Sequence, residues 1–346
     1  MGEVSMEDLR LLYANVAGIG EENSEKDIKI HKWINNNNPD IIGLAEANHN
    51  WWFRDVKPLK ERSQKWCQVL GKRSCQRAIF SHNEHDPHAP QFQIGGVVLI
   101  VRGQSVNRII DWGKDEKEMG RWAWVDLRGT RGSITRVIIA YRLVSSSNPG
   151  GSETVVSQHL RALDRLDDGR SPLAAFDDDF KGFIREGFQA GKQMILMMDV
   201  NEDVNSGKIA SMLQDFNMEE KLATYLQGPS PATHHRGSRT IDGIYASKTA
   251  STSKAEYLQF KDSPGDHRSR VWDVQQCSIF GNRNSPPEKR SPRRLQSRQP
   301  STVRRYHVHL ESLFCLHRLK ERTDNLRAIT TFPATLEVRR EYDILD

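Results

Sequence analysis

Eight short apolar segments, separated by segments with helical periodicity, constrain this chain of 346 residues more than any other feature. Short apolar runs are typical of buried β-strands, and apolar residues at three- and four-residue steps are typical of amphipathic helices. The predicted strands are residues 9–16, 40–44, 95–101, 122–127, 134–141, 194–198, 241–245 and 271–274. Because helices alternate with two groups of strands, the pattern predicts an α/β fold with two packed sheets rather than one open parallel sheet.

Local signals place the helices and turns between these strands. The chain opens as strand, helix and strand, with a helix over residues 25–34 that ends before Pro39. A later helix is expected to begin with Ser171 as its cap and Pro172 in its first turn. The aspartates at 177–179 are predicted to lie on the solvated face of that helix. The three strands between residues 95 and 141 are expected to be antiparallel and joined by hairpins.

Basic charge is concentrated in two segments, although the net charge of the chain is only +5. Residues 277–346 hold 14 Lys and Arg against 8 Asp and Glu, and residues 51–77 hold 8 against 2. Pro and Arg in 277–300 predict a linker after an α/β domain over 1–276. A basic helical tail is predicted over 301–346. Its helix, expected over 301–320, has an apolar face and is therefore expected to need a partner.

Several classes of protein are excluded by the same inspection. The longest apolar run is five residues, whereas a membrane-spanning helix needs about 20. The acidic N-terminus lacks the basic and apolar regions of a secretory signal. The four cysteines form no Cys-x-x-Cys pair, which favours free thiols in a reducing compartment. We expect a monomeric intracellular protein that is not secreted, with the nucleus as one location.

Polar residues at the ends of the predicted strands are the candidates for metal binding and catalysis. They are Asn15, Glu46, Asp199, Asn201, Asp242, Asp266 and His267. A single aspartate beside a strand is usually a turn or cap residue. Several carboxylates together with amide and imidazole groups are instead suited to a hard divalent cation and to a reaction at phosphorus.

These residues resemble the endonuclease/exonuclease/phosphatase superfamily, which includes DNase I, exonuclease III, AP endonucleases and retroelement endonucleases. The resemblance covers about residues 8–276. Seven segments carry it in family order: Leu12–Gly18, Pro39–Glu46, Gly95–Leu99, Ile138–Tyr141, Met197–Asn201, Thr240–Ile244 and Gly265–Arg268. The resemblance implies a four-layer α/β sandwich with two mixed sheets between helices.

The same resemblance implies a role for each matching residue. Glu46 would be the main ligand of a Mg²⁺ or Mn²⁺ ion, with Asn15 and Asp266 close to that ion. The catalytic set implied by the family is His267, Asp242, Asp199, Asn201 and Tyr141. In this set Asp242 would orient His267 beside the attacking water or the scissile phosphate. Asp199 would activate or position the water, Asn201 would hold a phosphate oxygen, and Tyr141 would lie against the phosphate.

Residues 51–77 favour a nucleic-acid substrate, because they combine basic and aromatic side chains directly after Glu46. Cations bind phosphates, and rings stack on bases. The predicted DNA surface comprises Trp51, Trp52, Arg54, Lys57 and, beside His267, Arg268. The alternative is that the aromatic residues of 51–77, Trp66 among them, belong to the core and the charges to an exposed helix face. Segments 293–306 and 310–318 resemble the connector that follows the endonuclease in non-LTR retroelements.

The resulting hypothesis is a metal-dependent phosphodiesterase that cuts DNA, related to retroelement or AP endonucleases. One alternative is a phosphatase of a small phosphoester such as an inositol phosphate. The Asp199 and Asp242 segments lack the neighbouring residues typical of that branch. The other alternative is a non-catalytic nucleic-acid-binding remnant, although Glu46, Asp199, Asp242 and His267 are all present.

Overall fold

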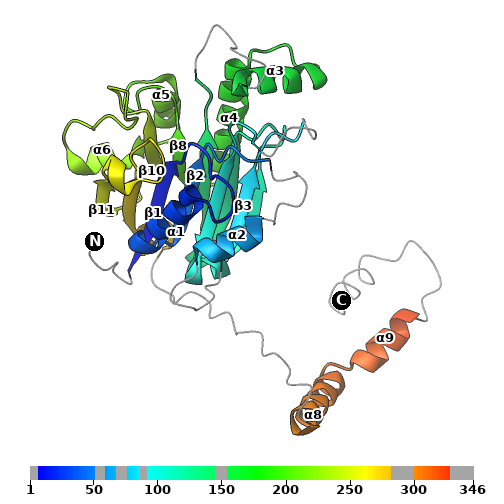
Figure 1. The fold of residues 1–346 in the computed structure, drawn as a ribbon. Coiled ribbons are helices and arrows are strands. Elements are labelled where there is room, and N and C mark those ends of the chain that lie inside the picture. Colours follow the sequence, from blue (N-terminus) through cyan, green and yellow to red (C-terminus); the bar gives the residue numbers. More distant parts are fainter. Residues whose placement is uncertain are drawn as a thin grey trace. The chain divides into compact units, whose positions relative to one another are not determined.

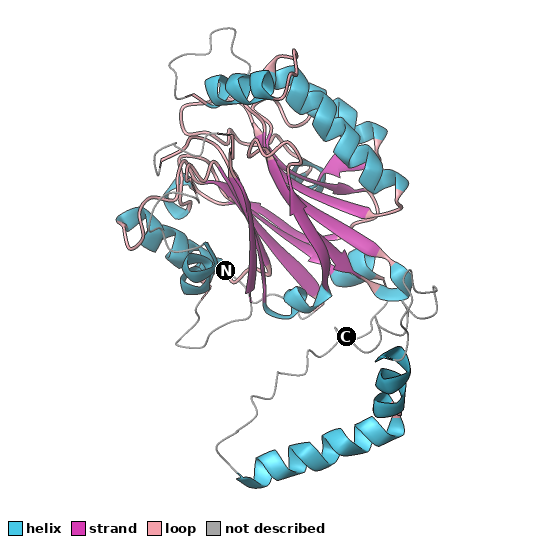
Figure 2. Ribbon diagram, turned by 90° about the vertical axis from the view of Figure 1, so that its right-hand side faces the viewer, coloured by secondary structure: helices cyan, strands magenta, loops and turns pink. Residues whose placement is uncertain are grey.

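The computed structural model describes residues 7–50, 59–67, 76–85, 92–144, 154–281 and 300–327. The chain divides into two compact units, residues 1–288 and 289–346. In the first unit two layers of strands pack face to face, with helices on both outer sides (Figures 1 and 2). This arrangement confirms the predicted α/β sandwich of two packed mixed sheets.

Within the described ranges, the strands are β1 (Asp8–Asn15), β2 (Ile41–Ala45), β3 (Gln76–Ser81), β4 (Val97–Arg102), β5 (Ile109–Lys114), β6 (Trp122–Arg128), β7 (Ile134–Tyr141), β8 (Gln193–Asp199), β9 (Met218–Glu220), β10 (Asp242–Ser247), β11 (Thr252–Tyr257) and β12 (Arg270–Gln275). The α-helices are α1 (Glu25–Asn37), α2 (Leu59–Trp66), α3 (Val155–Arg165), α4 (Pro172–Gln189), α5 (Lys208–Asp215), α6 (Lys221–Leu226), α7 (Gln276–Phe280), α8 (Pro300–Leu316) and α9 (Leu319–Arg327). Short 3₁₀ helices are η1 (Gly103–Arg108), η2 (Thr130–Gly132) and η3 (Phe260–Asp262).

Each sheet has six strands. The first has the order β11-β12-β1-β2-β4-β3 and the second the order β5-β6-β7-β8-β10-β9. The pairs β1–β2 and β7–β8 are parallel and the other pairs are antiparallel. All eight predicted strands are present. The four strands that the sequence did not predict, β3, β5, β9 and β11, are the four edge strands of the two sheets.

Side-chain alternation along β1 shows how the layers form. Leu9, Leu11 and Tyr13 belong to the core between the two sheets, whereas Leu12 and Ala14 pack with the helices on the outer face of the first sheet. Successive side chains of a strand point to opposite faces, so a strand buried on both sides is apolar throughout. The second sheet is covered on its outer face by α4, whose phenylalanines pack against Trp122.

Two expectations about connections need correction. The strand β4 does not form a hairpin series with β6 and β7, because it lies in the first sheet and they lie in the second. The intervening η1 and β5 carry the chain across, and β5 then pairs with β6. The helix predicted over residues 301–320 is divided, since α8 ends at Leu316 and α9 begins at Leu319.

The end of the first unit reaches beyond the predicted domain boundary at residue 276. Ile279 and Phe280 of α7 are buried in its core, and Thr135 Oγ1 donates a hydrogen bond to the Ile279 carbonyl at 2.6 Å. In the second unit Tyr306 and Phe314 of α8 are exposed. Over the described ranges, no helix is long and apolar enough to cross a membrane, and the three cysteines there are free thiols.

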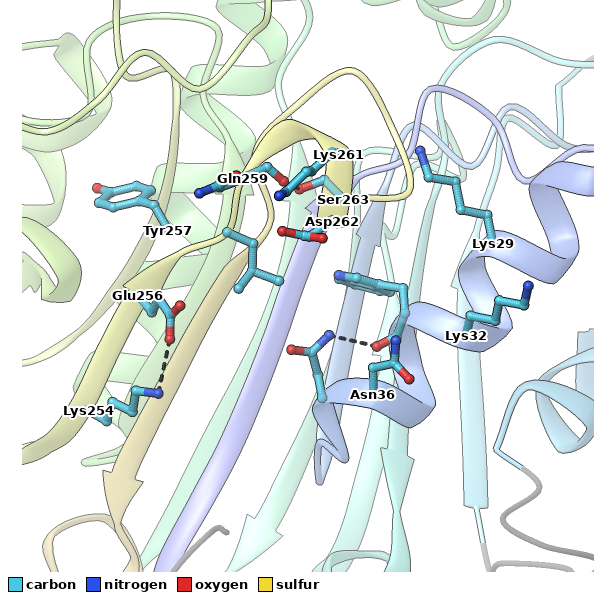
Figure 3. A pocket seen from close by; sticks show the side chains of 13 residues that line it. Lys29, Lys32, Asn36, Lys254, Glu256, Tyr257, Gln259, Lys261, Asp262 and Ser263 are labelled. Atoms are coloured by element: carbon cyan, nitrogen blue, oxygen red, sulfur yellow. Dashed lines mark hydrogen bonds and ion pairs between the residues drawn. The ribbon is translucent and has the colours of Figure 1, made fainter. Parts of the chain in front are cut away.

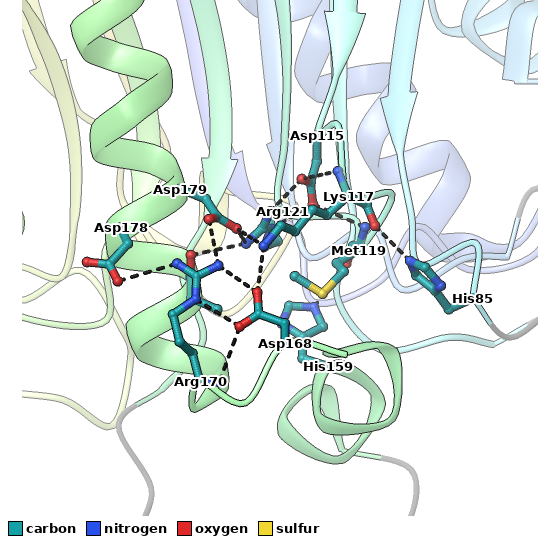
Figure 4. A network of polar contacts seen from close by, with 11 residues as sticks. His85, Asp115, Lys117, Met119, Arg121, His159, Asp168, Arg170, Asp178 and Asp179 are labelled. Atoms are coloured by element: carbon teal, nitrogen blue, oxygen red, sulfur yellow. Dashed lines mark hydrogen bonds and ion pairs between the residues drawn. The ribbon is translucent and has the colours of Figure 1, made fainter. Parts of the chain in front are cut away.

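The aspartate run of α4 was predicted to be solvated, and for two of its three members this is wrong. Asp179 accepts a hydrogen bond from the buried Arg121 at 2.8 Å, and Asp177 accepts two from the buried Arg142 at 2.7 and 3.0 Å. Figure 4 shows Arg121 between Asp179 and Asp115, with Arg170 at the outer side of the same network. Buried guanidinium groups need carboxylates beside them, and α4 supplies these.

We predict that Arg121→Met destabilises the protein by about 3–5 kcal/mol, because Asp115 is fully buried and loses its countercharge. Arg170→Met is the matched control, since Arg170 is 33% exposed and its ion pairs are screened by water. Arg170→Met is expected to lower the free energy of unfolding by about 1 kcal/mol or less. Urea unfolding measures both values, and an equal loss in the two variants would contradict this assignment.

Candidate active site

One edge of the two packed sheets collects most of the predicted site residues. Asn15, Tyr141 and Asp199 stand at the last positions of β1, β7 and β8, and Glu46 directly follows β2. Asp242 instead begins β10, and His267 precedes β12, so these two do not follow a strand as predicted. Both strands run antiparallel to their neighbours, so their first residues lie at the same edge as the last residues of β1 and β8.

Strand register aligns the side chains of the second sheet. Asp199 is the direct partner of Tyr141 on β7 and of Asp242 on β10. Paired residues of neighbouring strands point to the same face of a sheet. The register therefore places a phenol and two carboxylates in one row that faces the first sheet.

The side-chain amide of Asn15 holds the first of these carboxylates, Asp199, and so links the two sheets. Asn15 Nδ2 donates to Glu46 Oε1 at 2.9 Å and to Asp199 Oδ2 at 2.8 Å. The backbone N–H of Asn201 donates to the other carboxylate oxygen of Asp199 at 3.0 Å. Asn15 and Asp199 are fully buried, whereas Glu46 is half-buried and reaches solvent.

The second carboxylate, Asp242, is fully buried and contacts three residues of the first sheet or its loops. Tyr13 Oη donates to Oδ1 at 3.0 Å, and His267 Nδ1 lies 2.8 Å from Oδ2. The guanidinium of the fully buried Arg270 lies 3.1 Å from the same oxygen. The sequence prediction that Asp242 orients His267 describes the observed contact.

These contacts shift the pKa values of Asp199, Asp242 and His267 in different directions. Burial raises the pKa of Asp199 well above its usual value, and the neighbouring Asp242 adds to this. Burial also opposes ionisation of Asp242, but Arg270 and His267 hold its pKa below the usual value. Burial would lower the pKa of His267, yet Asp242, followed by Asp199, raises it to about 9. At neutral pH, His267 is therefore a cation beside an ionised Asp242.

The loop that carries Asp266 and His267 lies directly against the end of β1. A Cβ atom on Gly265 would come within 2.3 Å of the Asn15 carbonyl oxygen, so only glycine fits this close approach. Asp266 is 41% exposed, and its Oδ2 lies 3.5 Å from His234 Nε2. Its other oxygen, Oδ1, is buried and has no hydrogen-bond partner.

Tyr141 and Asn201 border the same edge. Burial, followed by the charges of Glu46 and Asp199, raises the pKa of Tyr141 well above its usual value, so its hydroxyl stays protonated. Asn201 Nδ2 donates to the Arg142 carbonyl at 2.6 Å. Glu46 and Asn201 both have left-handed backbones, with φ of 49° and 52°. Such conformations cost about 1–3 kcal/mol and are frequent at functional sites.

Of the five residues predicted to form the DNA surface, the structure describes only Arg268. Trp51, Trp52, Arg54 and Lys57 lie outside the described residues. Arg268 is engaged internally, because its guanidinium donates to the carbonyls of Ala232 and Leu258 and stacks over Phe260.

Two members of the 51–77 segment belong to the core instead of a binding surface. Trp66 is 1% exposed and donates from Nε1 to Asp27 Oδ1 at 2.6 Å. Arg62 is also buried and forms an ion pair with the same carboxylate at 2.9 Å. For Trp66 the alternative interpretation, an aromatic core, is correct, whereas Arg62 is buried and does not lie on the exposed helix face that this alternative assigned to the charges.

The sequence prediction missed Tyr13, Arg270 and His234. The alternation of β1 could have identified Tyr13, since it lies two residues before Asn15 and so on the same face. Arg270 stands at the start of an apolar strand, where a charged residue needs a buried partner. His234 comes from a loop far along the chain, and its position beside Asp266 depends on tertiary structure.

We predict a pH effect on stability that depends on His267. Its folded pKa of about 9 is above the ordinary 6.5, so the stabilisation is complete below pH 6.5 and is lost as pH rises through 9. In EDTA, the free energy of unfolding of the parent should fall by about 3 kcal/mol more than that of His267→Gln as the pH rises from 6.5 to above 9. Urea unfolding at several pH values tests this, and parallel pH curves for the two proteins would refute it.

Comparison with known proteins gives structural matches alone. No protein-family model and no curated protein matches this chain. An AP endonuclease from Leishmania major is similar with a TM-score of 0.55 and 12% identity, over 78% of this chain and 88% of that one. The 3′ phosphatase NExo from Neisseria, bound to a product DNA hairpin, has a TM-score of 0.50 and 13% identity, over 77% and 99%. The human Nocturnin catalytic domain has a TM-score of 0.49 and 18% identity, over 78% and 93%. The two structures with TM-scores of 0.55 and 0.50 show that this chain shares their fold.

Proposed function

We propose that this protein is a divalent-metal-dependent phosphodiesterase that cuts DNA internally. The observation that carries the proposal is the cluster at the sheet edge, where an imidazolium paired with a buried carboxylate lies close to a second buried carboxylate. The atoms offered by Asp199, Asp242 and His267 all lie within 4.8 Å of one another. Attack on a phosphodiester needs a positioned water, neutralised phosphate oxygens and a proton for the leaving oxygen.

The residues at the edge fit a hard divalent cation. Asp266 Oδ1 is buried without a hydrogen-bond partner, which is the state expected of an oxygen reserved for another ligand. Gly265 seats this loop against Asn15, and the Asn15 amide contacts Glu46. Glu46, Asn15 and Asp266 would hold the ion, and oxygen ligands of this kind suit Mg²⁺ or Mn²⁺. When bound, the ion would neutralise charge on the scissile phosphate.

Side chains of the protein supply the proton transfer and the phosphate binding. Asp199, whose pKa is raised, is suited to position the attacking water and accept its proton. His267, a cation at neutral pH, is suited to donate a hydrogen bond to a phosphate oxygen, and Asp242 fixes its ring through Nδ1. The Tyr141 hydroxyl and the remaining N–H of Asn201 are donors that can orient the phosphate.

DNA as the substrate is supported by two observations. Two similar structures with TM-scores of 0.50 or more are described as an AP endonuclease and as a 3′ phosphatase bound to a product DNA hairpin. The chain itself is basic, with 50 Lys and Arg against 45 Asp and Glu. A retroelement origin is part of the same proposal and rests on the sequence resemblance. A nuclear location is also proposed, and it rests on the free cysteines and on DNA as the substrate.

The test is nicking of supercoiled plasmid by the full chain with Mg²⁺ and with EDTA. We expect nicking with Mg²⁺ and none with EDTA. Glu46→Gln and His267→Gln should each reduce the rate by at least about 100-fold. Glu186→Gln is the matched control, because Glu186 is exposed on α4 and should cut as fast as the parent.

The outcomes separate the candidate functions. Nicking that persists in EDTA or in Glu46→Gln would contradict the metal-dependent mechanism. If folded parent protein leaves the plasmid intact but releases phosphate from a phosphomonoester, the protein is a phosphatase. If it binds DNA without hydrolysing either substrate, it is a binding module.

A further inference from the structure

A groove outside the catalytic edge lies between α1 and the segment from β11 through η3. Its volume is about 880 Å³. Figure 3 shows Lys29 and Lys32 on α1 along one wall, with Lys254, Glu256 and Lys261 on the other. The groove is formed on the outer side of the first sheet, whereas the active-site carboxylates lie between the two sheets.

The charge lining this groove is predominantly positive. Four lysines and two acidic residues line it. Lys254 is neutralised by Glu256 at 3.0 Å, which leaves Lys29, Lys32 and Lys261 against Asp262. These three lysines are exposed, so their ammonium groups are accessible to an anionic ligand, and each phosphate contact would release condensed counterions.

Two residues that line the groove carry buried polar atoms without a hydrogen-bond partner. Trp33 is 4% exposed and Asn37 is 3% exposed, and both line the groove. Trp33 Nε1 is a buried donor and Asn37 Oδ1 a buried acceptor, and neither has a hydrogen-bond partner. Unpaired buried polar atoms are rare in folded proteins, because each costs about 1–3 kcal/mol. An anionic oxygen would satisfy the indole N–H.

The lysines also connect the groove with the catalytic edge. Lys26 lies close enough to Asp266 for their charges to interact, and it also interacts with Lys29. Lys26, Lys29 and Lys32 follow one another at three-residue steps on α1, so each step advances about 4.5 Å along the helix. A row of separate cations suits a chain of phosphates better than a single phosphate group.

We propose that this groove binds the phosphate backbone of the DNA strand as it leaves the catalytic edge, with Lys29, Lys32 and Lys261 as the phosphate-binding residues. This inference rests on the proposed function, because it needs DNA as the substrate. It adds a binding surface that the predicted one, residues 51–57 and Arg268, does not include. The groove would bind all base sequences alike, since phosphate contacts carry no sequence information.

The experiment measures binding of a fluorescent 20-base-pair DNA duplex to the full chain in EDTA, at several salt concentrations. The variant is Lys29→Ala/Lys32→Ala/Lys261→Ala. We expect affinity at least about 10-fold weaker than that of the parent at 0.1 M salt. The slope of log affinity against log salt should decrease in magnitude by about 2 to 3, since three phosphate contacts are lost.

The matched control removes the same charge elsewhere, as Arg131→Ala/Arg185→Ala/Lys248→Ala. All three residues are exposed, and Arg131 and Lys248 lie at the opposite ends of β7 and β10 from the catalytic edge. The control should bind DNA like the parent. Hydrolysis of bis(p-nitrophenyl) phosphate with Mg²⁺ should be equal in the parent and in both variants, because this small diester does not reach the groove.

Each outcome has one meaning. Equal DNA affinity in the lysine variant and the control overturns the groove while leaving the phosphodiesterase proposal intact. If the parent binds no DNA, or binds an RNA duplex more tightly, the DNA assignment fails for the groove and for the active site together. An independent readout is the indole N–H resonance of Trp33, identified with Trp33→Phe. It should shift on DNA addition in the parent, and an unmoved resonance would contradict the proposal.

Discussion

Two fully buried carboxylates between apolar sheets impose the constraint on which the rest of the structure depends. Asp199 and Asp242 are direct partners on β8 and β10, and each would cost several kcal/mol to bury alone. Groups from the opposite sheet and its loops compensate for this cost. Asn15 donates to Asp199, while Tyr13, His267 and Arg270 surround Asp242. The sheets can therefore close only in the register that also assembles the site.

The same constraint relates stability to function. Burial and the like charge of Asp242 raise the pKa of Asp199, whereas opposite charges raise the pKa of His267 and lower that of Asp242. Groups shifted in this way are suited to move protons at neutral pH. The buried Arg142, which bonds to Asp177 of α4 and to the Val200 carbonyl, fixes the segments that follow β7 and β8.

The sequence predicted the centre of the fold better than its margins, for a physical reason. Central strands such as β4 and β8 are buried on both faces and are apolar throughout, whereas the edge strands β5 and β11 carry exposed polar residues and give no such signal. Asn15, Glu46 and Asp199 were predictable because each stands at or just after the end of an apolar strand, and these strand ends lie at one edge of the packed sheets. Arg270, His234 and the lysine groove depend on contacts between distant segments, and Asp177 and Asp179 appeared solvated because their buried arginine partners are remote in sequence.

The central claim is that this edge of the two sheets is a divalent-cation site built around Glu46, Asn15 and Asp266. Titration of Mn²⁺ into the full chain, followed by the electron paramagnetic resonance signal of the free ion, tests it most directly because the readout does not need a substrate. We expect that the parent binds Mn²⁺ and that Glu46→Gln and Asp266→Asn bind it at least about 10-fold more weakly. Equal Mn²⁺ binding by the parent and by both variants would contradict the claim.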